Sequence, residues 1–93
     1  MKIIKRNGSE AVFDISKIIA AVTKANNVVA SNQRLTKEQI TAIADDVAQE
    51  CQSRNHAMNV EEIQDLVEDA IMRTKAYEVA RKYITYRYVQ SLR

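Results

Sequence analysis

Residues 2–14 read KIIKRNGSEAVFD, and this stretch determines how the chain begins. Two short apolar runs flank Asn7-Gly8, the dipeptide that best accepts the two positive φ angles of a type I′ turn. The stretch therefore predicts a β-hairpin with a two-residue loop. The expected cross-strand pairs are Arg6 with Ser9, Lys5 with Glu10, Ile4 with Ala11, and Ile3 with Val12.

Four helices are expected after this hairpin, because apolar residues recur at helical spacing in four segments. The first begins at an Asp14 N-cap and ends near Asn26-Asn27. Capping-box pairs open the second and third, Thr36 with Gln39 and Asn59 with Glu62. The second should end around residues 53–55, the third near Thr74, and the fourth should run from Lys75 to Leu92, with Ala76, Ala80, Tyr83, Ile84 and Arg87 on its apolar stripe.

An isolated hairpin is marginal in water, so it should lie over these helices, joined by a third short strand at Ala57-Met58. With 93 residues and no Pro/Gly/Ser-rich linker, the chain is too short for two cores. We expect one domain over residues 1–93. Its predicted fold class is α+β, mostly α: a four-helix bundle capped by a small β-sheet formed around the N-terminal hairpin.

Composition excludes several kinds of site. The lone Cys51 cannot form an internal disulfide, has no partners for zinc, and is expected to be a buried packing thiol. A single Gly8 excludes the glycine-rich phosphate loops. No Ser-His-Asp or Cys-His pair suits covalent catalysis, so no reaction is expected of this chain. The longest apolar run, residues 18–22, is far too short for a membrane span, and a cytoplasmic location is expected.

Charge is unevenly distributed along the sequence. Residues 1–34 carry a net +4, residues 35–72 a net −7 and residues 73–93 a net +5. This asymmetry indicates either an anion site built from the two ends or attraction between oppositely charged surfaces of the fold. Arg87 poses the same choice, because on an apolar stripe it must either extend past the helix end to water or face an anion.

The cations nearest the hairpin form the most informative group. Lys5, Arg6 and Lys17 could converge on phosphate oxygens, beside the positive end of the first helix. The alternative is a solvated hairpin tip with an ordinary Asp14 cap. The acidic residues of the third helix are read mainly as a solvated face, with a magnesium role as the alternative.

Several of these stretches together resemble the ATP-cone, a nucleotide-binding regulatory domain at the N-terminus of many ribonucleotide reductases. They are Lys5-Arg6-Asn7-Gly8, Val12-Phe13-Asp14-Ile15-Ser16-Lys17-Ile18, the helix start Val60–Gln64, and Ala80-Arg81-Lys82-Tyr83-Ile84-Thr85-Tyr86-Arg87. The opening is most similar to that of the anaerobic, glycyl-radical (class III) ribonucleoside-triphosphate reductases.

The resemblance implies that ATP or dATP is held beneath the hairpin as an allosteric ligand, with Mg²⁺. The nucleotide-binding residues it implies are Ile3 at the adenine or ribose, Lys5, Arg6 and Lys17 at the phosphates, Asp14 at the base or sugar, Val60 and Gln64 lining the site, and Arg87, or a basic or tyrosine neighbour on the last helix, closing it. The chain departs from some members at Ala11, where they have a carboxylate, and at Gln64, where they have a histidine. Recognition of the base or deoxyribose could differ accordingly.

The implied function is allosteric sensing of the ATP:dATP ratio to control deoxyribonucleotide synthesis for DNA replication. The catalytic body of the reductase would lie outside these residues, and dATP would change how cones pack between subunits. The alternative is a small basic-ended helical module that binds nucleic acid or a protein partner, with tyrosines as stacking platforms; a helical dimerisation domain without ligand is the third. No membrane partner is expected, and nucleic acid is the less favoured ligand.

Overall fold

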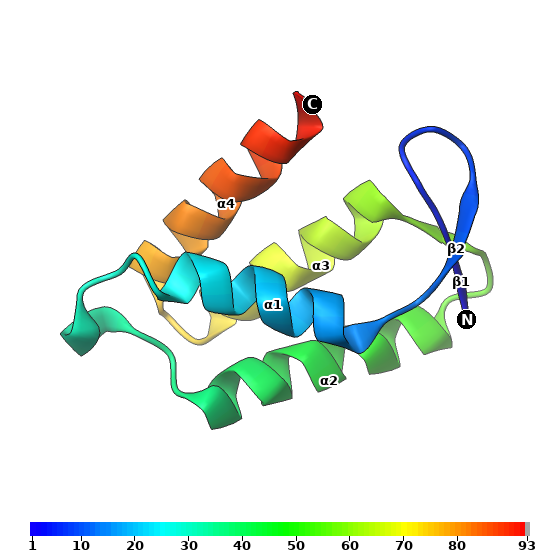
Figure 1. The fold of residues 1–93 in the computed structure, drawn as a ribbon. Helices are drawn as coiled ribbons and strands as arrows, with labels where there is room; N and C mark the ends of the chain where they lie inside the picture. Colours follow the sequence, from blue (N-terminus) through cyan, green and yellow to red (C-terminus); the bar gives the residue numbers. More distant parts are fainter. Residues whose placement is uncertain (93) are drawn as a thin grey trace.

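The computed structural model describes residues 1–92. Four helices and a small three-stranded sheet make up the fold (Figure 1). The elements are β1 (Lys2–Ile4), β2 (Glu10–Val12), α1 (Ile15–Asn26), a 3-10 turn at Ser31–Gln33, α2 (Lys37–Ser53), β3 (Met58–Asn59), α3 (Val60–Arg73) and α4 (Tyr77–Ser91). This arrangement confirms the predicted mostly α fold with a sheet built around the hairpin.

The sheet has the order β2-β1-β3, with β1 antiparallel to β2 and parallel to β3. The third strand was predicted at Ala57-Met58 and lies one residue later. Ile3 pairs with Met58, whose side chain is buried in the core. The hairpin is thereby attached to the start of α3, and it does not stand alone in solvent.

The predicted hairpin register is wrong by one residue. Ile3 pairs with Ala11 and Ile4 with Glu10. The amide of Gly8 donates to the Lys5 carbonyl at 2.9 Å, and Gly8 has φ +86°, whereas Asn7 lies outside the left-handed region. The loop therefore has three residues, a turn over Lys5–Gly8 closed by a left-handed glycine, in place of the two-residue type I′ turn.

Helix boundaries follow the caps in the sequence. The Asp14 side chain accepts from the amide of Ser16, and both predicted capping boxes form, Thr36 with Gln39 and Asn59 with Glu62. Each side chain satisfies backbone donors that have no partner within the helix. The ends of α1, α2 and α3 at Asn27, Arg54 and Thr74 confirm the predicted breaks.

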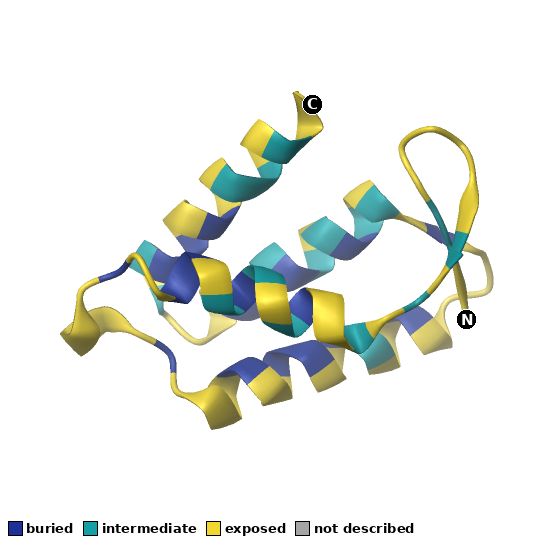
Figure 2. Ribbon diagram, viewed as in Figure 1, coloured by how far each residue is buried: buried dark blue, intermediate teal, exposed yellow. Residues whose placement is uncertain are grey.

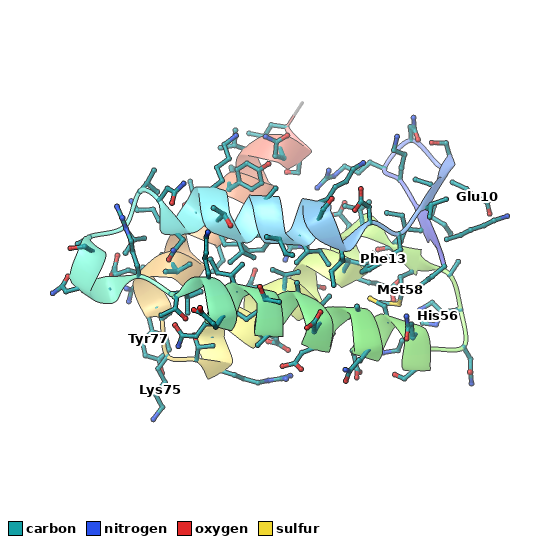
Figure 3. The ribbon with its side chains drawn as sticks, turned by 60° about the horizontal axis from the view of Figure 1, so that its bottom comes forward. Glu10, Phe13, His56, Met58, Lys75 and Tyr77 are labelled. Carbon is teal, nitrogen blue, oxygen red and sulfur yellow. The ribbon has the colours of Figure 1, made fainter. Side chains whose placement is uncertain are left out.

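The core lies where α1, α2, α3 and the first half of α4 face one another, and buried residues concentrate on these faces (Figure 2). Cys51 is buried as predicted, and burial raises the pKa of its thiol. Phe13 and Met58 lie at the end of the molecule near the sheet, and Lys75 and Tyr77 lie at the opposite end (Figure 3). No helix within residues 1–92 combines the length and apolar character that crossing a membrane requires.

The fourth helix differs from its prediction in two respects. It begins at Tyr77, because Lys75 adopts a left-handed φ of 66° and breaks the chain direction after α3. Val79, absent from the predicted stripe, is fully buried, whereas Ile84 is 40% exposed. The reason is that α4 diverges from the bundle (Figure 1), so only its first turns reach the core.

Candidate functional site

A cavity of about 230 Å³ lies beneath the hairpin, between the sheet, α1, α3 and α4. Six of the eight predicted site residues line it: Ile3, Lys5, Asp14, Lys17, Val60 and Gln64. They come from β1, the hairpin, the first turn of α1 and the first turns of α3, which the sheet and the caps bring together. The structure thus groups residues that are up to 61 positions apart in the sequence.

The inner wall of this cavity is apolar and its rim is charged. The wall is formed by Tyr83 and by apolar side chains, among them Phe13, Ile18, Ala21, Ile63 and Val67. Lys5 and Lys17 stand exposed at the rim. Such a site suits a ligand that combines a flat apolar part with negative charge, because each part meets a matching surface.

Asp14 connects the helix cap to the cavity rim. Its Oδ1 accepts from the Ser16 hydroxyl at 2.6 Å and from the Ser16 amide at 3.0 Å. These hydrogen bonds, with the charge of Lys17, lower the pKa of the Asp14 carboxyl, so it is ionised at neutral pH. Asp14 therefore offers only acceptors to a ligand, which suits hydroxyl or amino donors.

Arg6 lies above the cavity without lining it. Its Nη2 donates to Gln64 Oε1 at 3.2 Å, and its Nε lies 2.9 Å from Glu61 Oε1. Both partners belong to the first turns of α3. The hairpin tip is thus fastened across the cavity mouth by a guanidinium whose present partners are protein groups.

Arg87 does not line the cavity, and the anion it faces belongs to the chain itself. Its Nη1 lies 2.8 Å from Asp65 Oδ1 and 3.1 Å from Glu68 Oε1. Burial acts to lower the pKa of Arg87, but the hydrogen bonds and charges of Asp65 and Glu68 outweigh this effect and raise it. Tyr83, one turn earlier on α4, lines the cavity in its place, and burial raises its pKa to about 12.

The uneven charge of the sequence is explained in part by these contacts. Glu61, Asp65 and Glu68, read as a mainly solvated face, pair with arginines from both ends of the chain. Lys5 and Lys17, in contrast, make no ion pair with any group in residues 1–92. Attraction across the fold therefore accounts for Arg6 and Arg87, and two lysines at the cavity rim remain available to an external anion.

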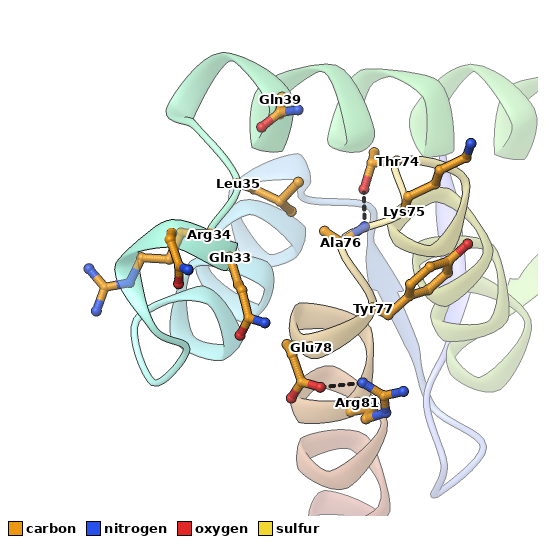
Figure 4. A pocket seen from close by; sticks show the side chains of 11 residues that line it. Gln33, Arg34, Leu35, Gln39, Thr74, Lys75, Ala76, Tyr77, Glu78 and Arg81 are labelled. Atoms are coloured by element: carbon orange, nitrogen blue, oxygen red, sulfur yellow. Dashed lines mark hydrogen bonds and ion pairs between the residues drawn. The ribbon is translucent and has the colours of Figure 1, made fainter.

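A larger cavity, about 430 Å³, lies at the opposite end of the molecule between the start of α2 and the α3–α4 turn (Figure 4). Both of its guanidinium groups have partners within the chain. Arg34 donates to the carbonyls of Val29 and Asn27, and Arg81 pairs with Glu78. Lys75 also lines this cavity and makes no ion pair within residues 1–92. The cavity beneath the hairpin is the better candidate because it places two such lysines, Lys5 and Lys17, beside an apolar wall.

Phe13 and Tyr83 line the cavity, although the sequence did not single them out as site residues. Phe13 is the single phenylalanine of the chain and directly precedes the Asp14 cap, a position from which its proximity to the site could have been inferred. Ala11, which the resemblance marked as a position that bears on recognition of the base or sugar, also lines the cavity. Tyr83 was included only as an unnamed tyrosine neighbour of Arg87.

The sequence matches a known protein family over nearly its whole length. The family model described as the ATP cone domain matches residues 1–92. The chain belongs to the ATP-cone family. This ATP cone is 37% identical over 91 residues to the anaerobic ribonucleoside-triphosphate reductase of Haemophilus influenzae, a match that covers 97% of the chain and 12% of that protein.

Two other relatives are reductases of different types. Identity is 30% over 95 residues with the ribonucleoside-diphosphate reductase subunit alpha of Chlamydia trachomatis, covering 94% of the chain and 9% of the relative. Identity is 35% over 91 residues with the vitamin B12-dependent ribonucleoside-diphosphate reductase of Thermoplasma acidophilum, a match that covers 92% of the chain and 11% of that relative. This ATP cone therefore spans about a tenth of the length of these curated relatives.

Proposed function

We propose that this ATP cone binds ATP or dATP in the cavity beneath the hairpin and serves as the allosteric regulatory module of a ribonucleotide reductase. The observation that carries the proposal is the pairing of an apolar cavity wall with two exposed lysines, Lys5 and Lys17, at its rim. An adenine ring needs the first, and a triphosphate needs the second.

In the proposed complex, the base enters between Ile3 and the apolar wall, and Val60 and Gln64 line its other side. The cavity volume of about 230 Å³ suits the base, so the phosphates extend to the open rim. There Lys5, Lys17 and Arg6 bind the phosphate oxygens, with Mg²⁺ accompanying the triphosphate. A ligand contact by Arg87 stays a prediction, since it would first require release from its carboxylate partners.

Asp14 is the proposed group for reading the sugar or base, because an ionised carboxylate accepts hydrogen bonds from hydroxyl or amino donors. ATP and dATP differ by one hydroxyl. Regulation requires that this difference change the relative affinity for two conformations or assemblies, because a ligand that binds both states equally shifts nothing. The chain would perform no reaction itself.

The partner in this proposal is the catalytic body of the reductase, and contacts between cones in an assembly are a second expected interface. The anaerobic triphosphate reductase class is favoured by the Haemophilus influenzae relative. We place the protein in the cytoplasm accordingly, with a role in supplying deoxyribonucleotides.

Calorimetric titration of the 93-residue chain with ATP, dATP and GTP tests the proposal, using Lys5→Glu as the variant. We expect saturable binding of ATP and dATP, weaker binding of GTP, and loss of adenine-nucleotide binding in Lys5→Glu. Lys75→Glu, the same charge reversal at the opposite end of the molecule, should bind as the natural sequence does.

Titration with a single-stranded oligonucleotide tests the alternative function, that of a nucleic-acid-binding module. Strongly salt-dependent binding of the oligonucleotide, without preference for ATP over other polyanions, would contradict the proposal and favour a nucleic-acid module. Absence of any nucleotide binding would contradict it in favour of a protein-interaction domain.

A further inference from the structure

Glu61, in the first turn of α3, lies between two arginines from opposite ends of the chain. Its Oε1 is 2.9 Å from Arg6 Nε, at the hairpin tip. Its Oε2 is 3.9 Å from Arg87 Nη2, near the end of α4. Because each carboxylate oxygen faces a different cation, one side chain links the mouth of the cavity to the last turns of α4.

The end of α4 is held to the bundle mainly by polar contacts. After Tyr83 no residue of α4 is buried, and Tyr88 is 63% exposed (Figure 2). Besides its pairs with Asp65 and Glu68, Arg87 donates to the backbone carbonyl of Glu61 at 3.4 Å. The Lys24 ammonium also lies over the ring of Tyr86, 5.1 Å from its centroid. The position of this segment therefore depends on charges more than on packing.

We infer that phosphate binding at Arg6 transfers Glu61 from Arg6 to Arg87 and so fastens the end of α4 more tightly to α3. The inference rests on the proposed function, because it requires a nucleotide phosphate at the hairpin tip. In the proposed complex Glu61 itself makes no contact with the nucleotide.

Two electrostatic effects act in the same direction. A triphosphate carries several negative charges and outcompetes a single carboxylate for the Arg6 guanidinium. The same charge repels Glu61 from the cavity mouth. Within residues 1–92 the ion pairs of Glu61 are with Arg6 and Arg87, so Arg87 is the cation that remains. At 3.9 Å that contact is longer than a hydrogen bond and has room to shorten.

Coupling between sites is reciprocal, so a contact that fastens the end of α4 would also favour nucleotide binding. Ile84, Tyr88 and Val89 stand exposed on this segment. Their positions would then depend on whether the cavity holds a nucleotide, which gives the cone a physical route from ligand to surface.

Amide hydrogen exchange of residues 84–91, measured by NMR on the 93-residue chain with and without saturating ATP, tests the inference. ATP should slow exchange in this segment by about two- to five-fold, the effect of one partly exposed ion pair. Glu61→Gln should bind ATP and show no such slowing. Asp69→Asn removes a charge from the same helix, where Asp69 pairs loosely with Arg73 at 3.9 Å, and should keep the full ATP effect.

Arg6→Gln without nucleotide is the second arm, since it releases Glu61 as the phosphate would. Exchange in residues 84–91 should slow in this variant, and unchanged or faster exchange would overturn the coupling even if no nucleotide bound. If calorimetry shows ATP binding while ATP leaves these amides unchanged, or slows them equally in Glu61→Gln, the inference fails and the proposed function stands. If ATP does not bind, the proposed function fails, and phosphate control of Glu61 fails with it.

Discussion

Replacing Asn26 with alanine should destabilise the domain severely, although the residue is a small polar one at a helix end. Asn26 is buried, with 7% of the residue's surface exposed. Its Nδ2 donates to the Leu35 carbonyl at 3.0 Å, and its Oδ1 accepts from the Leu35 amide at 2.8 Å. This pair of bonds joins the end of α1 to the residue before the Thr36 cap of α2.

The magnitude follows from what alanine would leave behind. The amide and carbonyl of Leu35 would lose their partners in a buried place, at a cost of about 1–3 kcal/mol each. The sum, roughly 2–6 kcal/mol, compares with a total stability of about 5–14 kcal/mol expected for a chain of this length. Asn26→Ala should therefore retain a folded state with a much lower urea midpoint.

Urea unfolding followed by circular dichroism at 222 nm measures this effect. The matched control is Asn27→Ala, one residue along the chain, where the asparagine is exposed. We expect a change below about 0.5 kcal/mol there, as for most exposed positions. A loss of less than about 1 kcal/mol in Asn26→Ala, with an unchanged m value, would show that the Leu35 amide and carbonyl do not depend on Asn26 for their stabilisation.

Three further predictions concern the hairpin and the titrating groups. Gly8→Ala should lower the free energy of unfolding in urea by about 1–2 kcal/mol, because Gly8 has φ +86°, a conformation that alanine adopts only with strain. A Cβ at this position would meet no atom within 4 Å, so the cost is conformational and not steric. No measurable loss would show that the loop rearranges. Hydrogen bonds from His56 and the Asn59 backbone hold the pKa of Glu62 below its usual 4.5, so Glu62 stabilises the fold above that pH, and this stabilisation is lost as the pH falls through the folded pKa. In thermal melts from pH 6 to 3, Glu62→Gln should therefore lose less stability on acidification than the natural sequence. An equal loss in both would contradict this prediction. Burial raises the pKa of Tyr83 from 10.0 to about 12. The contribution of Tyr83 to the free energy of unfolding is therefore fully present below pH 10, and about 2–3 kcal/mol of it is lost as the pH rises to 12. Urea unfolding between pH 9 and 12 should show a smaller loss in Tyr83→Phe and the full loss in Tyr88→Phe; the full loss in both variants would exclude Tyr83 as its source.

Local signals in the sequence determined much of the fold. Capping at Asp14, Thr36 and Asn59 depends on residues within three positions of each cap, so the sequence alone placed three helix starts. The hairpin register failed because Asn7-Gly8 is compatible with both two- and three-residue loops. The loop observed follows from Gly8 alone being left-handed in the turn.

Long-range partners could not be read from the sequence. Nothing near Asn26 shows that it bonds Leu35, and nothing near Arg87 shows that its anion is a set of carboxylates on α3. The grouping of six site residues in one cavity came from the resemblance and not from periodicity, since it depends on how the sheet lies over α1 and α3. The exposed end of α4 was missed because divergence from a bundle is a property of helix packing.

Amide chemical-shift mapping during an ATP titration shows whether the cavity beneath the hairpin is the nucleotide site. If ATP binds in this cavity, the largest shifts should fall on Lys5, residues 14–17, Val60 and Gln64. Shifts concentrated instead on residues 32–34 and 74–77, around the larger cavity at the opposite end, would contradict it.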